Sequence, residues 1–83
     1  MITAMSPLSR ALFYLDGFAE GDLHLVYQIS FGQLIQPGCS PRDVRSDIEN
    51  FFLKLSKTDT SKLEVIITEL DTLVRRLLKE KMG

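Results

Sequence analysis

The stretch from residue 60 to residue 83 carries the clearest repeat of apolar positions in the chain. Its apolar residues recur three and four positions apart, the spacing that places side chains on one face of an α-helix. They are Leu63, Ile66, Ile67, Leu70, Leu73, Val74, Leu77 and Leu78. At about 100° per residue they span an arc of roughly 140°, wider than the seam of a two-stranded coiled coil. A stripe this wide predicts a helix with more than one neighbour.

Two earlier helices are predicted from a shared start pattern, a serine followed by a proline. The pairs are Ser6-Pro7 and Ser40-Pro41. A serine hydroxyl can accept a hydrogen bond from a free backbone N–H, and proline suits the first helical position. The apolar residues that follow recur at helical spacing in both places. We therefore predict helices over residues 7–16 and 41–56.

Residues 22–36 fit two interpretations. Apolar residues alternate with other residues, as in a strand, at Leu23, Leu25, Tyr27, Ile29 and Phe31. A helical face is also present, at Leu23, Val26, Tyr27, Ser30 and Leu34. We favour a helix capped by Asp22, because no second strand-like segment exists to satisfy a strand's backbone groups. The alternative is that residues 23–31 form a strand that pairs with its own copy across a dimer.

These elements predict an all-α fold, a small antiparallel four-helix bundle with short loops. The chain of 83 residues forms a single domain over 1–83, with a loose N-terminus at residues 1–5. The predicted core is Leu8, Leu12, Leu15, Val26, Tyr27, Leu34, Val44, Ile48, Phe51, Phe52, Leu55, Leu63, Ile66, Ile67, Leu70, Val74 and Leu77.

Size and cysteine content limit how such a domain is stabilised. A chain this short buries only about 60–65% of the surface that its unfolded form exposes, so proteins of this size often need extra support. Cys39 is the only cysteine and His24 the only histidine. The chain therefore forms no internal disulfide, and it lacks the usual four ligands of a structural zinc site. Of the usual supports, oligomerisation remains.

Charge and hydropathy argue against nucleic acid and membranes. The formal net charge is −1, so the chain lacks the basic field that drives binding to nucleic acid or anionic lipid. No run approaches the roughly 20 apolar residues of a membrane span. Arg10 interrupts the apolar stretch near the N-terminus, which has no basic leader. With a single cysteine, these features predict a cytoplasmic protein.

The sequence offers little evidence of catalysis or metal binding. Cys39 precedes a predicted helix start, which can activate a thiol, but the only available base is His24. The acidic residues Asp16, Glu20 and Asp22 lack the ligand spacing of a twelve-residue calcium loop. We therefore expect no catalytic, cofactor-binding or metal-binding residues, and no cofactor.

One alternative function is a small helix-turn-helix DNA-binding regulator using residues 22–56. Arg42 and Arg45 at the start of the predicted third helix would then contact phosphates. Asp43 and Asp47 lie on the same helix and would repel them. Nucleic acid is therefore the less favoured partner.

Apolar residues outside the main helix faces give the best indication of function. They are Phe13, Leu53 and Val65. Together with the wide stripe of residues 60–83, they predict an exposed patch suited to a protein partner. We take the anchors to be Phe13, Leu53, Leu73, Leu77 and Leu78. The sequence thus predicts an interaction module without enzymatic activity, which forms a homodimer or serves as a subunit or adaptor of a larger regulatory assembly.

Overall fold

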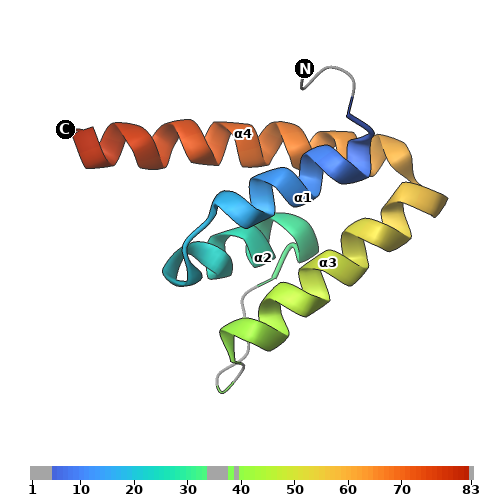
Figure 1. Ribbon diagram of the computed structural model, residues 1–83, viewed down its shortest axis with the longest axis horizontal. Coiled ribbons are helices and arrows are strands. Elements are labelled where there is room, and N and C mark those ends of the chain that lie inside the picture. The colour runs from blue at the N-terminus through green and yellow to red at the C-terminus, as the bar shows by residue number, and fades with distance from the viewer. Residues whose placement is uncertain (1–4, 34–37, 39, 83) are drawn as a thin grey trace.

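Four α-helices dominate the part of the chain that the structure describes. The computed structural model describes residues 5–33, 38 and 40–82. Its elements are α1 (Pro7–Gly17), the short 3₁₀ helix η2 (Glu20–Asp22), α2 (Leu23–Phe31), α3 (Pro41–Thr58) and α4 (Thr60–Met82) (Figure 1). These described residues contain no strand. The predicted all-α fold is therefore confirmed, as is the helical interpretation of residues 23–31.

Both serine–proline pairs start helices as predicted. The backbone N–H of Ser9 donates to Ser6 Oγ at 3.2 Å, and that of Asp43 donates to Ser40 Oγ at 3.2 Å. Each hydroxyl satisfies one of the backbone donors that lack an intrahelical partner at a helix N-terminus. Helices α1 and α3 consequently begin at the predicted residues.

Helix α2 is shorter than the predicted range 22–36, because Gly32 ends it. Gly32 has a φ of 73°, in the left-handed region, and its N–H donates to the Gln28 carbonyl at 2.8 Å. Glycine suits this conformation because it has no Cβ to meet the following carbonyl. The prediction that Asp22 caps α2 is wrong, since its side chain makes no capping hydrogen bond and η2 leads directly into the helix. The predicted helical residues 34–36 lie outside the described residues.

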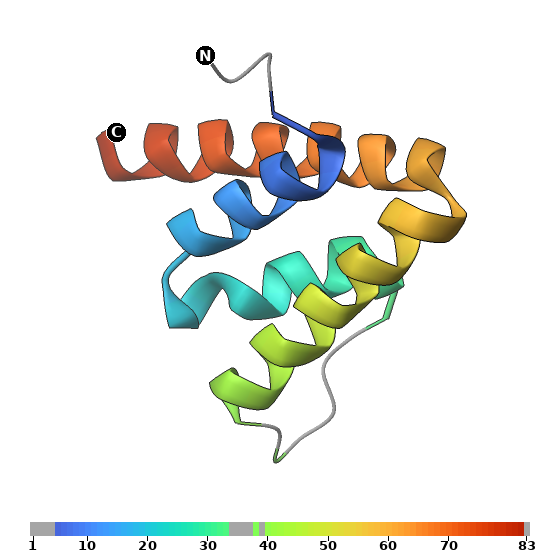
Figure 2. The same cartoon turned by 45° about the vertical axis from the view of Figure 1, so that its right-hand side comes forward.

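A single residue, Asp59, separates α3 from α4 and binds the ends of both. Its N–H donates to the Leu55 carbonyl at 2.8 Å, at the end of α3, and its Oδ1 accepts from the N–H of Lys62 at 3.1 Å, at the start of α4. The backbone at Asp59 leaves the helical region, with φ of −154° and ψ of 76°. The chain therefore makes a corner at this point, visible where α3 meets α4 (Figure 2).

The core is built from all four helices and is closed within one chain. The predicted core residues that are buried are Leu15, Val26, Val44, Ile48, Phe52, Leu55, Leu63, Ile66, Ile67 and Leu70. Those that are partly buried and pack against them are Leu8, Leu12, Tyr27, Phe51, Val74 and Leu77. Leu34 lies outside the described residues. The predicted core omitted four further buried apolar residues of the described ranges, which are Ala11, Phe18, Leu23 and Leu73.

The helices pack with α4 across the other three. Helix α4 contacts α1, α2 and α3, which confirms the prediction that its wide stripe has several neighbours. The pairs α1–α2 and α3–α4 run in opposite directions, whereas α2 and α3 point the same general way (Figures 1 and 2). Of the helices described, none combines the length and apolar character needed to cross a bilayer.

Polar side chains join α1 to α4 along the surface. Arg10 Nη1 lies 3.3 Å from Glu64 Oε1, and the Tyr14 hydroxyl donates to Asp71 Oδ1 at 2.8 Å. Asp71 also pairs with Arg75, four residues further along α4, at 3.0 Å. The hydrogen bond to the Asp71 carboxylate, which needs the hydroxyl proton, raises the pKa of Tyr14 above its ordinary value.

Candidate protein interface

The predicted anchor residues separate into buried and exposed side chains. Leu73 is only 2% exposed and belongs to the core, so its assignment as a surface anchor is wrong. Leu77 is partly buried, and Phe13, Leu53 and Leu78 are exposed. A stripe of helical spacing shows which side of α4 is apolar. It does not show how far along α4 the neighbouring helices reach.

The apolar face of α4 continues beyond the core that it covers. Its buried residues end at Leu73, yet the pattern continues through Val74 and Leu77 to Leu78, which is 54% exposed. In both views the C-terminal turns of α4 extend past the ends of α1 and α2 (Figures 1 and 2). The last part of the stripe therefore has fewer neighbours than the part before it.

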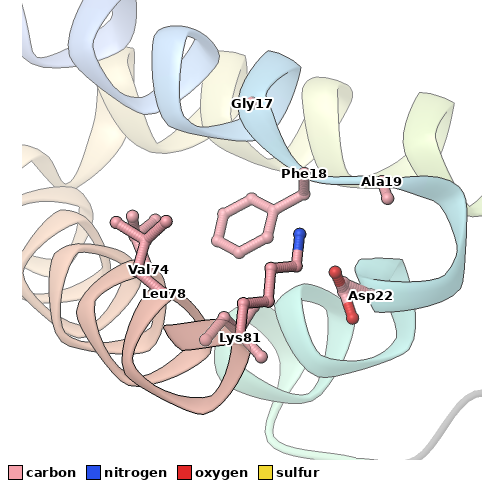
Figure 3. Close-up of a pocket in the computed structure, with 8 residues that line it drawn as sticks. Gly17, Phe18, Ala19, Asp22, Val74, Leu78 and Lys81 are labelled. Carbon is pink, nitrogen blue, oxygen red and sulfur yellow. The ribbon is translucent and has the colours of Figure 1, made fainter. Parts of the chain in front are cut away.

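A groove lies between this end of α4 and the connection from α1 to α2. It has a volume of about 130 Å³ and is lined by Gly17, Phe18, Ala19, Asp22, Val74, Leu77, Leu78 and Lys81. We call it the C-terminal groove. Phe18 follows the last turn of α1 in extended backbone and is buried. Its ring forms one side of the groove, and Val74 and Leu78 lie on the opposite helix (Figure 3).

The two walls of the C-terminal groove carry opposite charges. Asp22 stands at the end of η2, and Lys81 stands in the last turn of α4. The Lys81 side chain extends from α4 toward the connection between α1 and α2, on which Phe18, Ala19 and Asp22 lie (Figure 3). Ion pairs within 4.0 Å among the described residues are Arg10–Glu64, Arg45–Asp16, Arg45–Glu49 and Arg75–Asp71. Asp22 and Lys81 are in none of these pairs.

The other exposed anchors lie outside the C-terminal groove. Leu53 lines a second groove, of about 300 Å³, between α1 and α3, together with Leu8, Leu12, Asp16, Glu49 and Asn50. Phe13 lines neither groove, and its ring meets Tyr14 edge-on with 6.2 Å between ring centres. Val65, on α4, also lines neither groove. The predicted single patch is thus divided among several places on the surface.

Sequence reasoning missed an aromatic row where α2 meets α3. The ring of Phe31 lies 4.5 Å from that of Tyr27 and 4.6 Å from that of Phe51, measured between centroids. Lys62 places its ammonium group 5.5 Å from the Phe51 ring centre, a cation–π distance. These rings are partly buried against the core. They close the contact between α2, α3 and the start of α4.

Within the described part of the chain, the residues considered as catalytic or metal-binding candidates do not form a common site. His24 is exposed on α2, and Cys39 lies outside the described residues. Asp16 accepts a contact from Arg45, whereas Glu20 and Asp22 lie in η2. Within the described ranges, no group of three or more His, Cys, Asp or Glu side chains is arranged to hold a metal ion.

The segment considered for DNA binding differs in two ways from a helix-turn-helix. Residues 32–40 separate α2 from α3, whereas the motif uses a turn of about three to four residues. Arg45 contacts the carboxylates of both Asp16 and Glu49, the latter at 3.0 Å. Its charge is therefore already balanced within the fold, and Arg42 is left as the exposed basic residue at this helix start.

Among the described residues, the fold defines a small all-α domain with a closed core and several shallow surface grooves, the C-terminal groove among them. Comparison with protein-family models, with curated proteins and with solved structures gave no significant match. Function must therefore be inferred from the residues of this chain.

Proposed function

We propose that this protein is a small protein–protein interaction module, which self-associates or serves as a subunit of a larger regulatory assembly. The observation that supports it is the apolar face of α4, which continues past the last buried residue, Leu73, to the exposed Leu78. Val74 and Leu77 pack against the core, but Leu78 does not. The apolar character of Leu78 is therefore not needed to hold the monomer together.

Energetics supports a partner for this face. Complete burial of a leucine side chain contributes about 1.5–3 kcal/mol relative to exposure. Leu77 and Leu78 obtain only part of that contribution within one chain, because the first is partly buried and the second is exposed. A partner seated in the C-terminal groove would supply the remainder and would also cover the partly buried Val74.

The near-neutral charge supports a protein partner over nucleic acid. The net charge is −1, and Arg45 is already paired with two carboxylates. Protein interfaces combine an apolar centre with a polar rim, and the C-terminal groove likewise has Val74, Leu77 and Leu78 beside Asp22 and Lys81. We place the module in the cytoplasm, because its single cysteine matches the low disulfide usage of that compartment, and we assign it no catalytic activity.

A capture experiment with matched variants tests the proposal. Tagged wild-type protein, Leu78→Asp and Val65→Asp would each be expressed in the cells that naturally contain the chain, and bound proteins would be identified by mass spectrometry. Both substitutions place a carboxylate at an exposed apolar position of α4, 54% exposed in one case and 59% in the other. Only Leu78 lines the C-terminal groove.

The two variants separate specific binding from general stickiness. We expect a partner, either another protein or an untagged copy of the chain, that is retained by wild type and Val65→Asp and lost by Leu78→Asp. Circular dichroism would confirm that all three proteins are helical. Equal retention by all three, or retention by none, would overturn the proposal.

A further inference from the structure

We infer that the C-terminal groove binds a second copy of this chain through a two-fold axis, so that Lys81 of each copy faces Asp22 of the other. This inference rests on the proposed function and names the partner. Three features of the groove carry it. These are its apolar lining, its walls of opposite charge, and the overhang of α4 beside it.

The distribution of charge makes the groove complementary to itself. In a two-fold interface the same surface occurs on both sides, so that if residue i contacts residue j, then j contacts i. A surface with one acidic and one basic wall meets this condition, because the rotation places each wall against its opposite. Asp22 and Lys81 are the charged residues that line the groove. The symmetric arrangement therefore forms two ion pairs across the axis and encloses Leu78 of both copies.

A partner helix with charges of one sign fits less well. An acidic helix would face Lys81 favourably but would meet Asp22, and a basic helix would have the opposite difficulty. Like charges brought together across an interface oppose binding. A second copy brings both signs at the required positions, and for this reason we favour it over an unrelated amphipathic helix.

The basic end of α4 fixes where the axis passes. Residues 75–81 contain Arg75, Arg76, Lys79 and Lys81 against the single acidic residue Glu80. Two such ends laid side by side would repel each other. The axis must therefore place each α4 end over the partner's η2, where Glu20 and Asp22 supply negative charge. The overhang of α4 leaves its last turns accessible for that contact (Figure 1).

The test is a charge exchange measured by sedimentation velocity. Wild type, Lys81→Glu, Asp22→Lys and an equimolar mixture of the two variants would be compared from about 10 µM to about 1 mM. Lys81→Glu alone would bring two carboxylates together at both symmetric contacts, and Asp22→Lys alone would bring two ammonium groups together at both. In the mixture, a heterodimer of unlike chains pairs a carboxylate with an ammonium group at both contacts, whereas each homodimer keeps two repulsive contacts.

We expect wild type to dimerise as concentration rises, and each single variant to dimerise at least tenfold more weakly, since two attractive surface pairs become repulsive. The doubly substituted chain Asp22→Lys/Lys81→Glu should recover wild-type association, because both of its contacts are attractive again with their polarity exchanged. Added salt should weaken wild type and strengthen the single variants. Leu78→Asp should remain monomeric, while Val65→Asp should behave like wild type.

The mixture gives a separate check on the symmetry. A heterodimer of the two single variants pairs a carboxylate with an ammonium group at each of its two contacts, so both of its contacts are attractive. We therefore expect the mixture to recover association through heterodimers, as the doubly substituted chain does through homodimers, whereas either variant alone stays weak.

Each contrary result has a defined meaning. A wild type that stays monomeric throughout overturns the second copy as partner, but the proposed function stands if Leu78→Asp loses a captured protein. A dimer that is indifferent to both single substitutions overturns the groove as the site of self-association. If the single variants are weakened and neither the mixture nor the doubly substituted chain recovers, Asp22 does not meet Lys81 across the axis, and the proposed pairing is wrong.

Discussion

Ser30, on α2, places a hydroxyl group in the apolar core. The residue is 4% exposed, and its Oγ has no hydrogen-bond partner among the described residues. A buried polar group without a partner costs about 1–3 kcal/mol, because it has lost its hydrogen bonds to water. Replacing Ser30 with alanine removes that group and changes little else in the packing, so we expect Ser30→Ala to raise the free energy of unfolding.

The size of the gain follows from two contributions. Removing the unpaired hydroxyl contributes about 1 kcal/mol, at the lower end of the range for such groups. Alanine also favours the helix over serine by about 0.5 kcal/mol. We therefore expect an increase of about 1.5 kcal/mol, which raises the midpoint of thermal unfolding by roughly 6–12 °C in a domain of this size.

Urea denaturation followed by circular dichroism measures this difference, and Ser46→Ala is the matched control. Ser46 is exposed in the interior of α3, so its replacement adds only the helix propensity of alanine, about 0.5 kcal/mol. The dependence of unfolding free energy on urea should be unchanged in both variants. If Ser30→Ala is no more stable than wild type, the hydroxyl has a partner in the folded protein and the reasoning is refuted.

Two further predictions concern α1 and α2. The Tyr14 hydroxyl donates to Asp71 at 2.8 Å and has a raised pKa, so its contribution, about 0.5–1 kcal/mol, is fully present below its ordinary pKa of 10.0. This contribution is lost as the pH rises through the raised pKa of Tyr14. Urea denaturation should therefore show that the difference in unfolding free energy between wild type and Tyr14→Phe narrows above pH 10.0. A difference that stays constant to about pH 11 would contradict this prediction. Gly17→Ala should stabilise by about 0.5–1 kcal/mol, because Gly17 is helical and a Cβ there meets open space. Gly32→Ala should destabilise by about 1 kcal/mol, because its φ of 73° strains any side chain; thermal unfolding of both variants checks this pair, and equal effects would refute it.

Local patterns accounted for the helices and most of the core. Ser6 and Ser40 cap as predicted, because a cap depends on residues only three positions apart. The end of α2 was missed because the apolar pattern continues to Leu34, while Gly32 ends the helix through its own backbone conformation. The spacing of apolar residues alone does not show that a glycine can end a helix before its apolar pattern ends.

The candidate site was predictable only in part, because it depends on distances that sequence spacing does not contain. Leu77 and Leu78 were recognised from the stripe, but Leu73 was assigned to the surface although the helices packed against α4 bury it. That Asp22 and Lys81 line the same groove has no sequence signal, since the two residues are far apart along the chain. Their placement arises from the length of α4 relative to α1 and from the position of η2 (Figure 1).

The single-residue corner at Asp59 also bears on how quickly the chain folds. The entropy lost on closing a loop rises with its length, and a connection of one residue between α3 and α4 keeps that loss small. Contacts between neighbouring helices are local in sequence, and proteins rich in local contacts fold fast. The hairpin of α3 and α4 is thus suited to form early and to offer an apolar surface on which α1 and α2 assemble. Asp59, which turns the chain between α3 and α4, would then also determine the order in which the helices pack together.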